Sequence, residues 1–312
     1  MPPLLTDVRF AFGRGLRKEQ GPSVLSSPLL RGIQHGRITI AASDLNALVP
    51  PTPFTWHHLT NLNLELNGKS FLAMNSQTAY RLLKGCTHLK SLKFPFRSSE
   101  IGPLTEGLLV VPSLESLVII DKSHSFDVFG NLVGHFTIPR LAVFSVEIHT
   151  TGTPSDMLFL EHLARHSPLI SDLTLDISNF TMASLVSTLP LFSCLAKLSL
   201  LLSWDSDDEV ATKLLTSLTP NSSAPNPCPA LQELFIESRG LTDPIWSKFL
   251  QSHLDCRTSL RQLHLQFWCD PPDIIPDVER FLTRGLNVSL MYCPVKKSLK
   301  RGRVTPWDGV EL

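Results

Sequence analysis

Short patterns of alternating apolar and polar residues recur along the whole chain. Each copy follows the template Leu-x-x-Leu-x-Leu, in which isoleucine, valine or phenylalanine sometimes replaces a leucine. In the segment 86–94, CTHLKSLKF, the template positions are Leu89, Leu92 and Phe94. Because side chains along a strand alternate between two faces, this spacing predicts a half-buried strand with its apolar residues on one side.

Ten copies of the template recur at intervals of 25 to 36 residues, with a mean of about 28. A period of this length, with one strand and one helix or turn per unit, is typical of leucine-rich repeats. We therefore expect an α/β leucine-rich-repeat solenoid, with a curved parallel sheet on the concave face and helices and turns on the convex face. The copies begin at Leu5, Leu30, Leu59, Leu89, Leu114, Leu141, Ile170, Leu195, Leu231 and Leu260, and the copy at Leu30, LRGIQH, is the weakest.

The spacers between the copies carry helix signals. In 154–170 we expect Ser155 or Asp156 to cap a helix, and in 203–218 acidic residues precede an apolar stripe. A closing strand is expected at Val288, Leu290 and Tyr292. These patterns predict a repeat domain over 1–293, followed by a basic tail, 294–312, that contains Trp-Asp-Gly. The expected inward-facing helix residues are Leu158, Leu160, Leu163 and Ala164 in the first helix, and Val210, Leu214, Leu215 and Leu218 in the second.

The composition is that of a folded protein with no preferred charged partner. The 54 leucines match the repeat, and 28 basic residues balance 28 acidic ones. With zero net charge we expect no specific nucleic-acid binding, and the chain shows neither a signal peptide nor an apolar stretch long enough to span a bilayer. We therefore expect a protein of the cytoplasm or nucleus with no membrane partner.

No set of residues indicates catalysis, a cofactor or a metal. His162 and His166 have the i, i+4 spacing of metal ligands on a helix, but no third ligand is evident, and a surface pair is the better interpretation. Cys86 and Cys228 each lie three residues before a template leucine, as in the cysteine-containing type of leucine-rich repeat, so we expect them to pack in the core. The protein is not expected to be an enzyme.

What remains as a candidate functional region is the solvent-facing side of the strands. With the template leucines pointing inward, the residues between them line the concave face, the surface that such arrays use to bind proteins. Phe235, flanked by Glu233 and Glu237, is the preferred hot spot, with a cross-strand aromatic contact as the alternative. The candidate protein-binding residues are Asn61, Asn63, Glu65, Ser91, Lys93, Asp172, Thr174, Asp176, Glu233, Phe235, Glu237, Gln262 and His264.

The segment 296–303, KKSLKRGR, has five basic residues in eight. Such a run can serve as a nuclear import signal or contact a polyanion, and it equally suits a solvated tail. The sequence does not decide between these interpretations.

Several segments of the sequence resemble the leucine-rich-repeat region of fungal F-box proteins of the basidiomycete type. They are FTWHHLTNLNLEL from Phe54, the SPLI and PLLTDVRF openings, the irregular spacing and the ending TPWDGVEL. In that family an amino-terminal F-box docks on the adaptor of an SCF-type ubiquitin ligase, and the repeats hold the substrate. The resemblance therefore implies a substrate receptor, not a catalyst.

The F-box itself is absent from the chain, because a strand template already occupies residues 3–10. One hypothesis is a substrate-recognition module whose F-box was lost by truncation, in which case it contacts the ligase adaptor only through an upstream F-box. The other is a leucine-rich-repeat scaffold or adaptor protein that works without the ligase.

Overall fold

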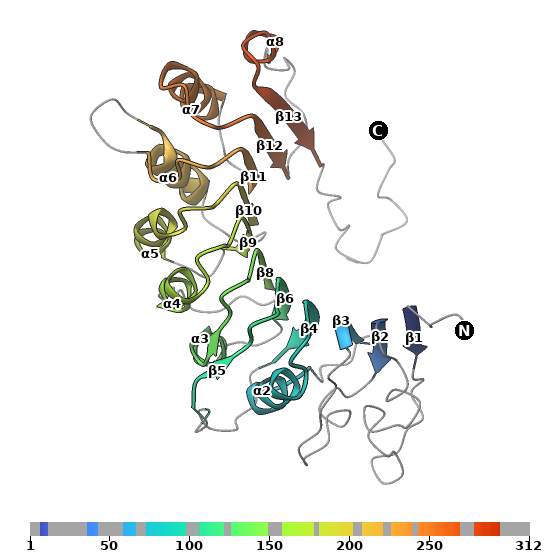
Figure 1. The fold of residues 1–312 in the computed structure, drawn as a ribbon. Helices are drawn as coiled ribbons and strands as arrows, with labels where there is room; N and C mark the ends of the chain where they lie inside the picture. Colours follow the sequence, from blue (N-terminus) through green and yellow to red (C-terminus); the bar gives the residue numbers. More distant parts are fainter. Residues whose placement is uncertain are drawn as a thin grey trace, which may run out of the picture.

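A computed structural model describes residues 7–11, 36–42, 59–66, 73–97, 104, 107–121, 126–148, 158–177, 181–201, 208–220, 226–238, 243–268 and 278–293. Within these residues the chain has an α/β fold. From the fourth strand onward, one strand and one helix alternate along most of the sequence. Strands line one side of a curved row and helices line the other (Figure 1).

Eleven strands of the described chain form one sheet, in which every neighbouring pair is parallel. The order in space is the order in sequence, so each strand pairs only with the strands before and after it. The sheet is open, with β1 and β13 at its two edges. The strands are β1 (Asp7–Ala11), β2 (Gly36–Ala42), β3 (Leu59–Leu66), β4 (Ser91–Phe96), β6 (Ser116–Asp121), β8 (Val143–Ile148), β9 (Asp172–Asp176), β10 (Lys197–Leu201), β11 (Glu233–Ser238), β12 (Gln262–Phe267) and β13 (Asn287–Tyr292).

The helices connect consecutive strands and pack on one face of the sheet (Figure 1). The first helix of the described residues is capped by Asn75, whose side chain accepts a hydrogen bond from the Thr78 N–H at 2.8 Å. The helices are α2 (Ser76–Gly85), α3 (Phe126–Gly134), α4 (Leu158–His166), α5 (Met182–Thr188), the 3₁₀ turn η2 (Leu189–Leu191), α6 (Asp208–Leu218), α7 (Asp243–Asp255) and α8 (Glu279–Leu282).

A repeated hydrogen-bond pattern joins each unit to the next just before the strand begins. The Glu115 carbonyl accepts the N–H groups of Ala142 at 2.9 Å and Val143 at 3.0 Å. The Ala142 carbonyl in turn accepts those of Ser171 at 2.9 Å and Asp172 at 3.0 Å, and the pattern recurs at the start of β10, β11 and β12. Since backbone groups are satisfied between units, each unit depends on its neighbours.

A tight turn leads into several of these strands. The Leu141 N–H donates to the Ile138 carbonyl at 3.1 Å, with Pro139 between them, and the Leu231 N–H donates to the Cys228 carbonyl at 3.2 Å across Pro229. Proline suits this second position of the turn because its ring fixes the required φ angle. The turn therefore sets the point at which each strand starts.

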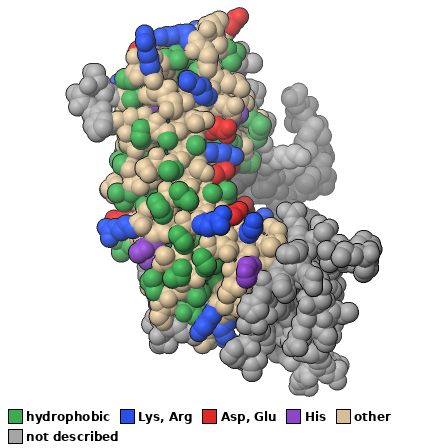
Figure 2. Space-filling model, viewed as in Figure 1, with side chains coloured by type: hydrophobic (Ala, Val, Ile, Leu, Met, Phe, Trp, Pro, Cys, Tyr) green, Lys and Arg blue, Asp and Glu red, His purple; other side chains and the backbone are tan. Residues whose placement is uncertain are grey.

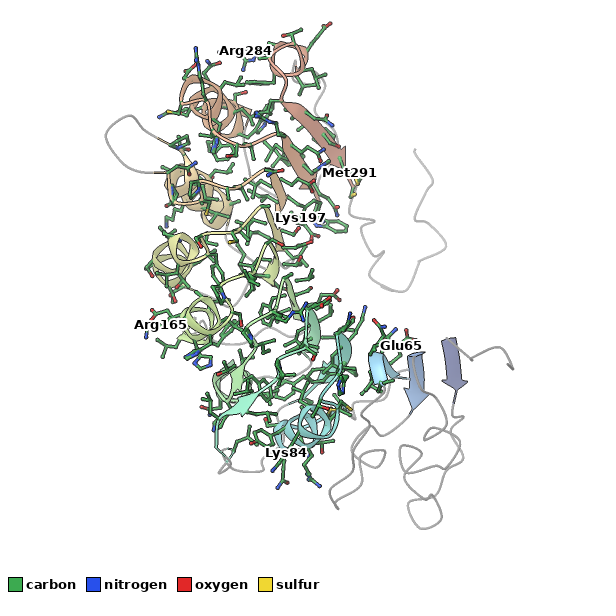
Figure 3. All side chains as sticks on the ribbon, in the orientation of Figure 1. Glu65, Lys84, Arg165, Lys197, Arg284 and Met291 are labelled. Atoms are coloured by element: carbon green, nitrogen blue, oxygen red, sulfur yellow. The ribbon has the colours of Figure 1, made fainter. Side chains whose placement is uncertain are left out.

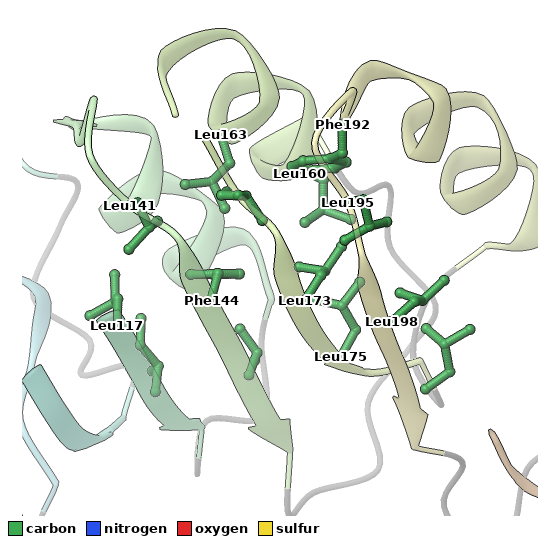
Figure 4. Close-up of a cluster of buried hydrophobic side chains, with 14 of the residues drawn as sticks. Leu117, Leu141, Phe144, Leu160, Leu163, Leu173, Leu175, Phe192, Leu195 and Leu198 are labelled. Atoms are coloured by element: carbon green, nitrogen blue, oxygen red, sulfur yellow. The ribbon is translucent and has the colours of Figure 1, made fainter. Parts of the chain in front are cut away.

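From Leu59 onward, the template residues form the core between the sheet and the helices, as predicted. Leu89, Leu92 and Phe94 are fully buried, with Cys86 beside them. Figure 4 shows the same arrangement in the following units, where leucines of β9 and β10 pack toward α4. Each such leucine contributes about 1.5–3 kcal/mol through burial, which the loss of chain entropy largely offsets.

The strand that the structure describes between β1 and β3 is β2, where Ile38 pairs with Val8 of β1 and Leu62 of β3. The sequence pattern did not predict this copy, and the predicted copy LRGIQH, residues 30–35, lies outside the described residues. The segment Ile38–Thr39–Ile40 is β-branched throughout, which favours a strand more strongly than a single leucine does. Counting leucines alone missed this copy.

Two further details of the helix side differ from expectation. Leu158, predicted to face the core, is 70% exposed, and Phe159 is buried in its place beside Leu160, Leu163 and Ala164. The buried face of α4 is thus rotated by about one residue from the face that the sequence predicted. A short parallel pair, β5 (Leu109–Val110) with β7 (Phe136–Thr137), was not predicted, because two residues are too few to show a period.

The remaining helix and edge predictions fall into two groups. Leu214, Leu215 and Leu218 of α6 are buried as expected, and the closing strand β13 forms at the predicted residues. The proposed caps Ser155 and Asp156, the side chain of Val210 and the tail 294–312 lie outside the described residues.

Candidate functional site

The strand side chains that point away from the helices form the open face. Ser91 and Lys93 lie on it and are half-buried, whereas Leu92 between them is fully buried. The same alternation holds in β12, where Gln262, His264 and Gln266 are half-buried. The register predicted from the template is therefore confirmed in these strands. Figure 3 shows Glu65, Lys197 and Met291 on this side, and Arg165 on the helix side.

Because the strands are in register, the open-face residues line up in three rows that cross the sheet. We call them the amino-end, middle and carboxyl-end rows, after the end of the strands at which they lie. The amino-end row contains Asn61, Ser91, Ser116, Val143, Asp172, Lys197, Glu233, Gln262 and Asn287. The middle row contains Asn63, Lys93, Val118, Ser145, Thr174, Ser199, Phe235, His264 and Ser289. The carboxyl-end row contains Pro95, Ile120, Glu147, Asp176, Leu201, Glu237, Gln266 and Met291.

A hollow of about 400 Å³ lies on the open face over β9 to β12. It forms where the middle row changes from the small residues Thr174 and Ser199 to the larger Phe235 and His264, which pair across the strands. Phe235 is the register partner of His264 of β12, and the two interpretations of Phe235, a binding hot spot or a cross-strand aromatic contact, both stay predictions. The hollow is lined by Thr174, Lys197, Ser199, Leu201, Glu233, Phe235 and His264.

Charged residues border the amino-end side of the hollow. The Lys197 ammonium lies 3.5 Å from the Asp172 carboxylate, and on its other side Lys197 pairs across the strands with Glu233. Figure 2 shows acidic and basic side chains alternating near the strand side of the molecule. Because Lys197 is about half exposed, this ion pair adds little stability, and its charges remain able to contact a bound molecule.

The carboxyl-end row is acidic where it passes the hollow. Burial raises the pKa of the Glu237 carboxyl, the Trp268 indole N–H opposes this by donating to Oε1 of Glu237, and the charge of Asp176 raises the pKa further. Asp176 was predicted to be available on the open face, but it is only 7% exposed. Asp176 is the last residue of β9 and is the register partner of Leu201 of β10.

The first strands of the open face lie apart from the hollow. There the Asn63 amide donates to Glu65 at 2.9 Å and the Asn61 amide donates to the Thr60 hydroxyl at 3.0 Å. The structure thus gathers Thr174, Glu233, Phe235 and His264 of the predicted set around one hollow. It leaves Asn61, Asn63, Glu65, Ser91 and Lys93 several strands away.

Four residues of the site are absent from the candidate list. Lys197, Ser199 and Leu201 line the hollow, and Trp268, just after β12, hydrogen-bonds to Glu237. The strict template alternation places Leu201 on the open face, and this was the signal available in the sequence. Trp268 lies beyond its strand, and nothing in the repeat pattern marks it.

The described residues contain no group of three or more His, Cys, Asp or Glu side chains placed to hold a metal. The rings of His162 and His166 are tilted by 36° to one another with their centres 4.3 Å apart, and His162 Nε2 donates to the Phe136 carbonyl at 2.8 Å. Cys86 and Cys228 are buried as predicted, and burial raises the pKa of each thiol to about 12. At neutral pH these thiols are protonated and poor nucleophiles.

No helix among the described residues is both long and apolar enough to cross a bilayer. The chain matches no protein-family model and no curated protein.

Proposed function

We propose that the chain is a leucine-rich-repeat solenoid whose open face binds another protein. The repeating strand–turn–helix unit and the unit-to-unit hydrogen bonds support the solenoid. The same unit recurs at a period of about 28 residues in the sequence.

The observation that carries the protein-binding proposal is the hollow around Phe235. It combines an accessible aromatic ring with hydroxyl groups, a cation and a carboxylate within one depression. Aromatic residues in recessed, partly apolar positions contribute most of the energy of many protein interfaces. A hollow of about 400 Å³ can accept one or two side chains of a partner.

Within this proposal we favour substrate recognition for an SCF-type ubiquitin ligase, in the cytoplasm or nucleus. The support is the resemblance to the repeat region of fungal F-box proteins. The alternative is a repeat scaffold or adaptor that works without the ligase. Neither version assigns the chain a catalytic role or a cofactor.

Quantitative co-purification tests the binding surface. Proteins recovered with the tagged wild-type chain are compared with those recovered with Phe235→Ala, which removes the ring, and Ser199→Trp, which fills the hollow. Leu191→Ala is the matched control, because Leu191 is 47% exposed but lies outside the sheet. We expect a defined partner to be lost with both open-face variants and retained with the control. Recovery of the same proteins by all four chains would refute the proposal.

The ligase version has its own readout in the same experiment. If the chain is a substrate receptor, the adaptor and cullin subunits should be recovered with a form that carries any upstream F-box. Recovery of a partner without these subunits favours the scaffold.

A further inference from the structure

Over β8 to β13 the carboxyl-end row of the open face carries three carboxylates and no basic residue. Glu147, Asp176 and Glu237 belong to β8, β9 and β11, and the other members of the row over these strands are Leu201, Gln266 and Met291. Leu201 of this row also lines the hollow. This stretch of the sheet face is therefore a negatively charged strip that borders the proposed binding site.

Within the strip, the negative charges of Asp176 and Glu237 repel one another. Burial raises the pKa of Glu237, and the negative charge of Asp176 raises it as well. A cation brought against the strip relieves this cost, since an opposite charge within about 4–6 Å favours the ionised form of a carboxyl group. The strip is thus complementary to a lysine- or arginine-bearing segment.

The same chain leaves the sheet at the edge where the strip lies. All strands are parallel, so the end of β13 lies at the carboxyl edge together with the ends of β8 to β11. The Cys293 N–H donates to the Phe267 carbonyl at 2.7 Å, which fixes the chain at this edge. Met291, the last open-face residue of β13, is 55% exposed and pairs with Gln266 of the same row.

The basic segment 296–303 begins three residues after this fixed point. Neighbouring strands are about 4.8 Å apart, so β11 lies roughly 10 Å and β8 roughly 24 Å from β13. An extended chain advances about 3.3 Å per residue, so Lys296 reaches roughly 10 Å and Arg303 roughly 33 Å from Cys293. The five basic residues therefore cover the distance over which the three carboxylates are spread.

We propose that the basic segment 296–303 docks on the carboxyl-end row of its own chain, across β11 to β8. The short connection to Cys293 gives the segment an effective concentration in the millimolar range, which favours its own sheet over a second copy. Leu299 lies between the two groups of basic residues and matches the apolar Met291 and Leu201 of the row. The docked segment borders the hollow, so a partner must displace it, and it acts as an internal competitor.

Trypsin cleavage of the full chain tests this docking. Mass spectrometry follows cleavage within 296–303 for the wild type and for the double variant Glu147→Gln/Glu237→Gln at low salt. The matched control is Glu115→Gln/Glu161→Gln, which changes the net charge equally at positions outside the open face. Relative to the wild type at low salt, we expect cleavage to be about fivefold faster or more in the open-face variant, and likewise in the wild type at high salt. The control variant at low salt should be cleaved at the wild-type rate. Equal rates in all three chains at low salt would overturn the proposal.

A zero-length cross-linker that joins lysines to carboxylates distinguishes the possible occupants. The docking predicts links from Lys296, Lys297 or Lys300 to Glu147 or Glu237 within one molecule. Mixing light and isotopically heavy chains separates these from links between copies. Links found only in mixed light–heavy pairs would assign the segment to a second copy and refute the internal docking. These outcomes do not depend on whether an external partner is found.

Discussion

Cys86 and Cys228 show how position in the repeat sets the chemistry of a single side chain. Both lie three residues before a template leucine, at the start of the turn that leads into a strand, and both are buried. Cys194 and Cys256 are exposed. Burial keeps the first two thiols protonated, with pKa values of about 12.

Thiol labelling should therefore separate these cysteines. A thiol reagent at pH 8 should modify Cys194 and Cys256 in the native protein and leave Cys86 and Cys228 unmodified, because the thiolate is the reacting form. In denaturant all four should react. Peptide mass spectrometry gives the rate at each site, and labelling of native Cys86 as fast as Cys194 would contradict its place in the core.

Alternation along β4 gives a second test at the residue scale. Leu92→Ala should lower the free energy of unfolding by about 2–5 kcal/mol, since it leaves a cavity in the core. Lys93→Glu, at the half-buried neighbour, should change it by no more than about 0.5 kcal/mol. Urea unfolding measures both, and a larger loss from Lys93→Glu would place that side chain in the core.

At the scale of the element, the strands were predicted better than the helices. The strands of the strong template copies lie where leucine or its equivalents occur at fixed offsets, because the inward face of a strand needs only a period of two. The copy around Ile38 was missed because isoleucine replaces leucine there. The α4 stripe was misassigned at Leu158, since helix rotation depends on how the neighbouring units pack.

The candidate site was predicted in part, for a related reason. The template shows which residues of one strand face outward, and so it identified Phe235 and His264. It does not show which residues of different strands meet, because that depends on register across intervals of 25 to 36 residues. The grouping of Thr174 with Glu233, and the contact between Trp268 and Glu237, therefore needed the structure.

Helix α7 carries a buried histidine that should make the stability depend on pH. His253 packs on Phe249 with ring centres 4.3 Å apart, and its Nδ1 lies 2.6 Å from the Thr258 hydroxyl. Burial lowers its pKa from 6.5 to about 4, against the opposing effect of the Leu218 carbonyl. The unfolded chain therefore binds a proton at a higher pH than the native chain does.

Because the native pKa is the lower one, the stability that His253 contributes is present above pH 6.5 and is lost as the pH falls toward 4. Between pH 7.5 and 5 the loss should be about 2 kcal/mol. Urea unfolding at several pH values measures it. His253→Gln should flatten this dependence, whereas His88→Gln, at an exposed turn position, should leave it unchanged. If the free energy of unfolding of His253→Gln depends on pH as strongly as that of the wild type, groups other than His253 cause the dependence.

At the scale of the whole molecule, each unit contacts mainly the units before and after it. The sheet follows sequence order, and the helix contacts likewise run from α3 to α4 and from α6 to α7. In such an array a local change affects neighbours more than distant units.

Hydrogen exchange should reveal this one-dimensional organisation. Leu173→Ala, in the core of β9, should speed amide exchange in β8 and β10 by much more than in β4 or β13. The measurement is exchange followed by mass spectrometry of strand peptides under native conditions. An equal increase in all strands would mean that the chain unfolds as one cooperative unit.

The central claim is that a partner binds the open face at the hollow. Hydroxyl-radical footprinting of the chain with and without a partner recovered by co-purification tests it most directly. Oxidation of Phe235 and His264 should fall when the partner is bound, while Leu158 and Leu191, exposed outside the sheet, should be oxidised as before. Protection of Leu158 or Leu191 with Phe235 and His264 unchanged would contradict the claim.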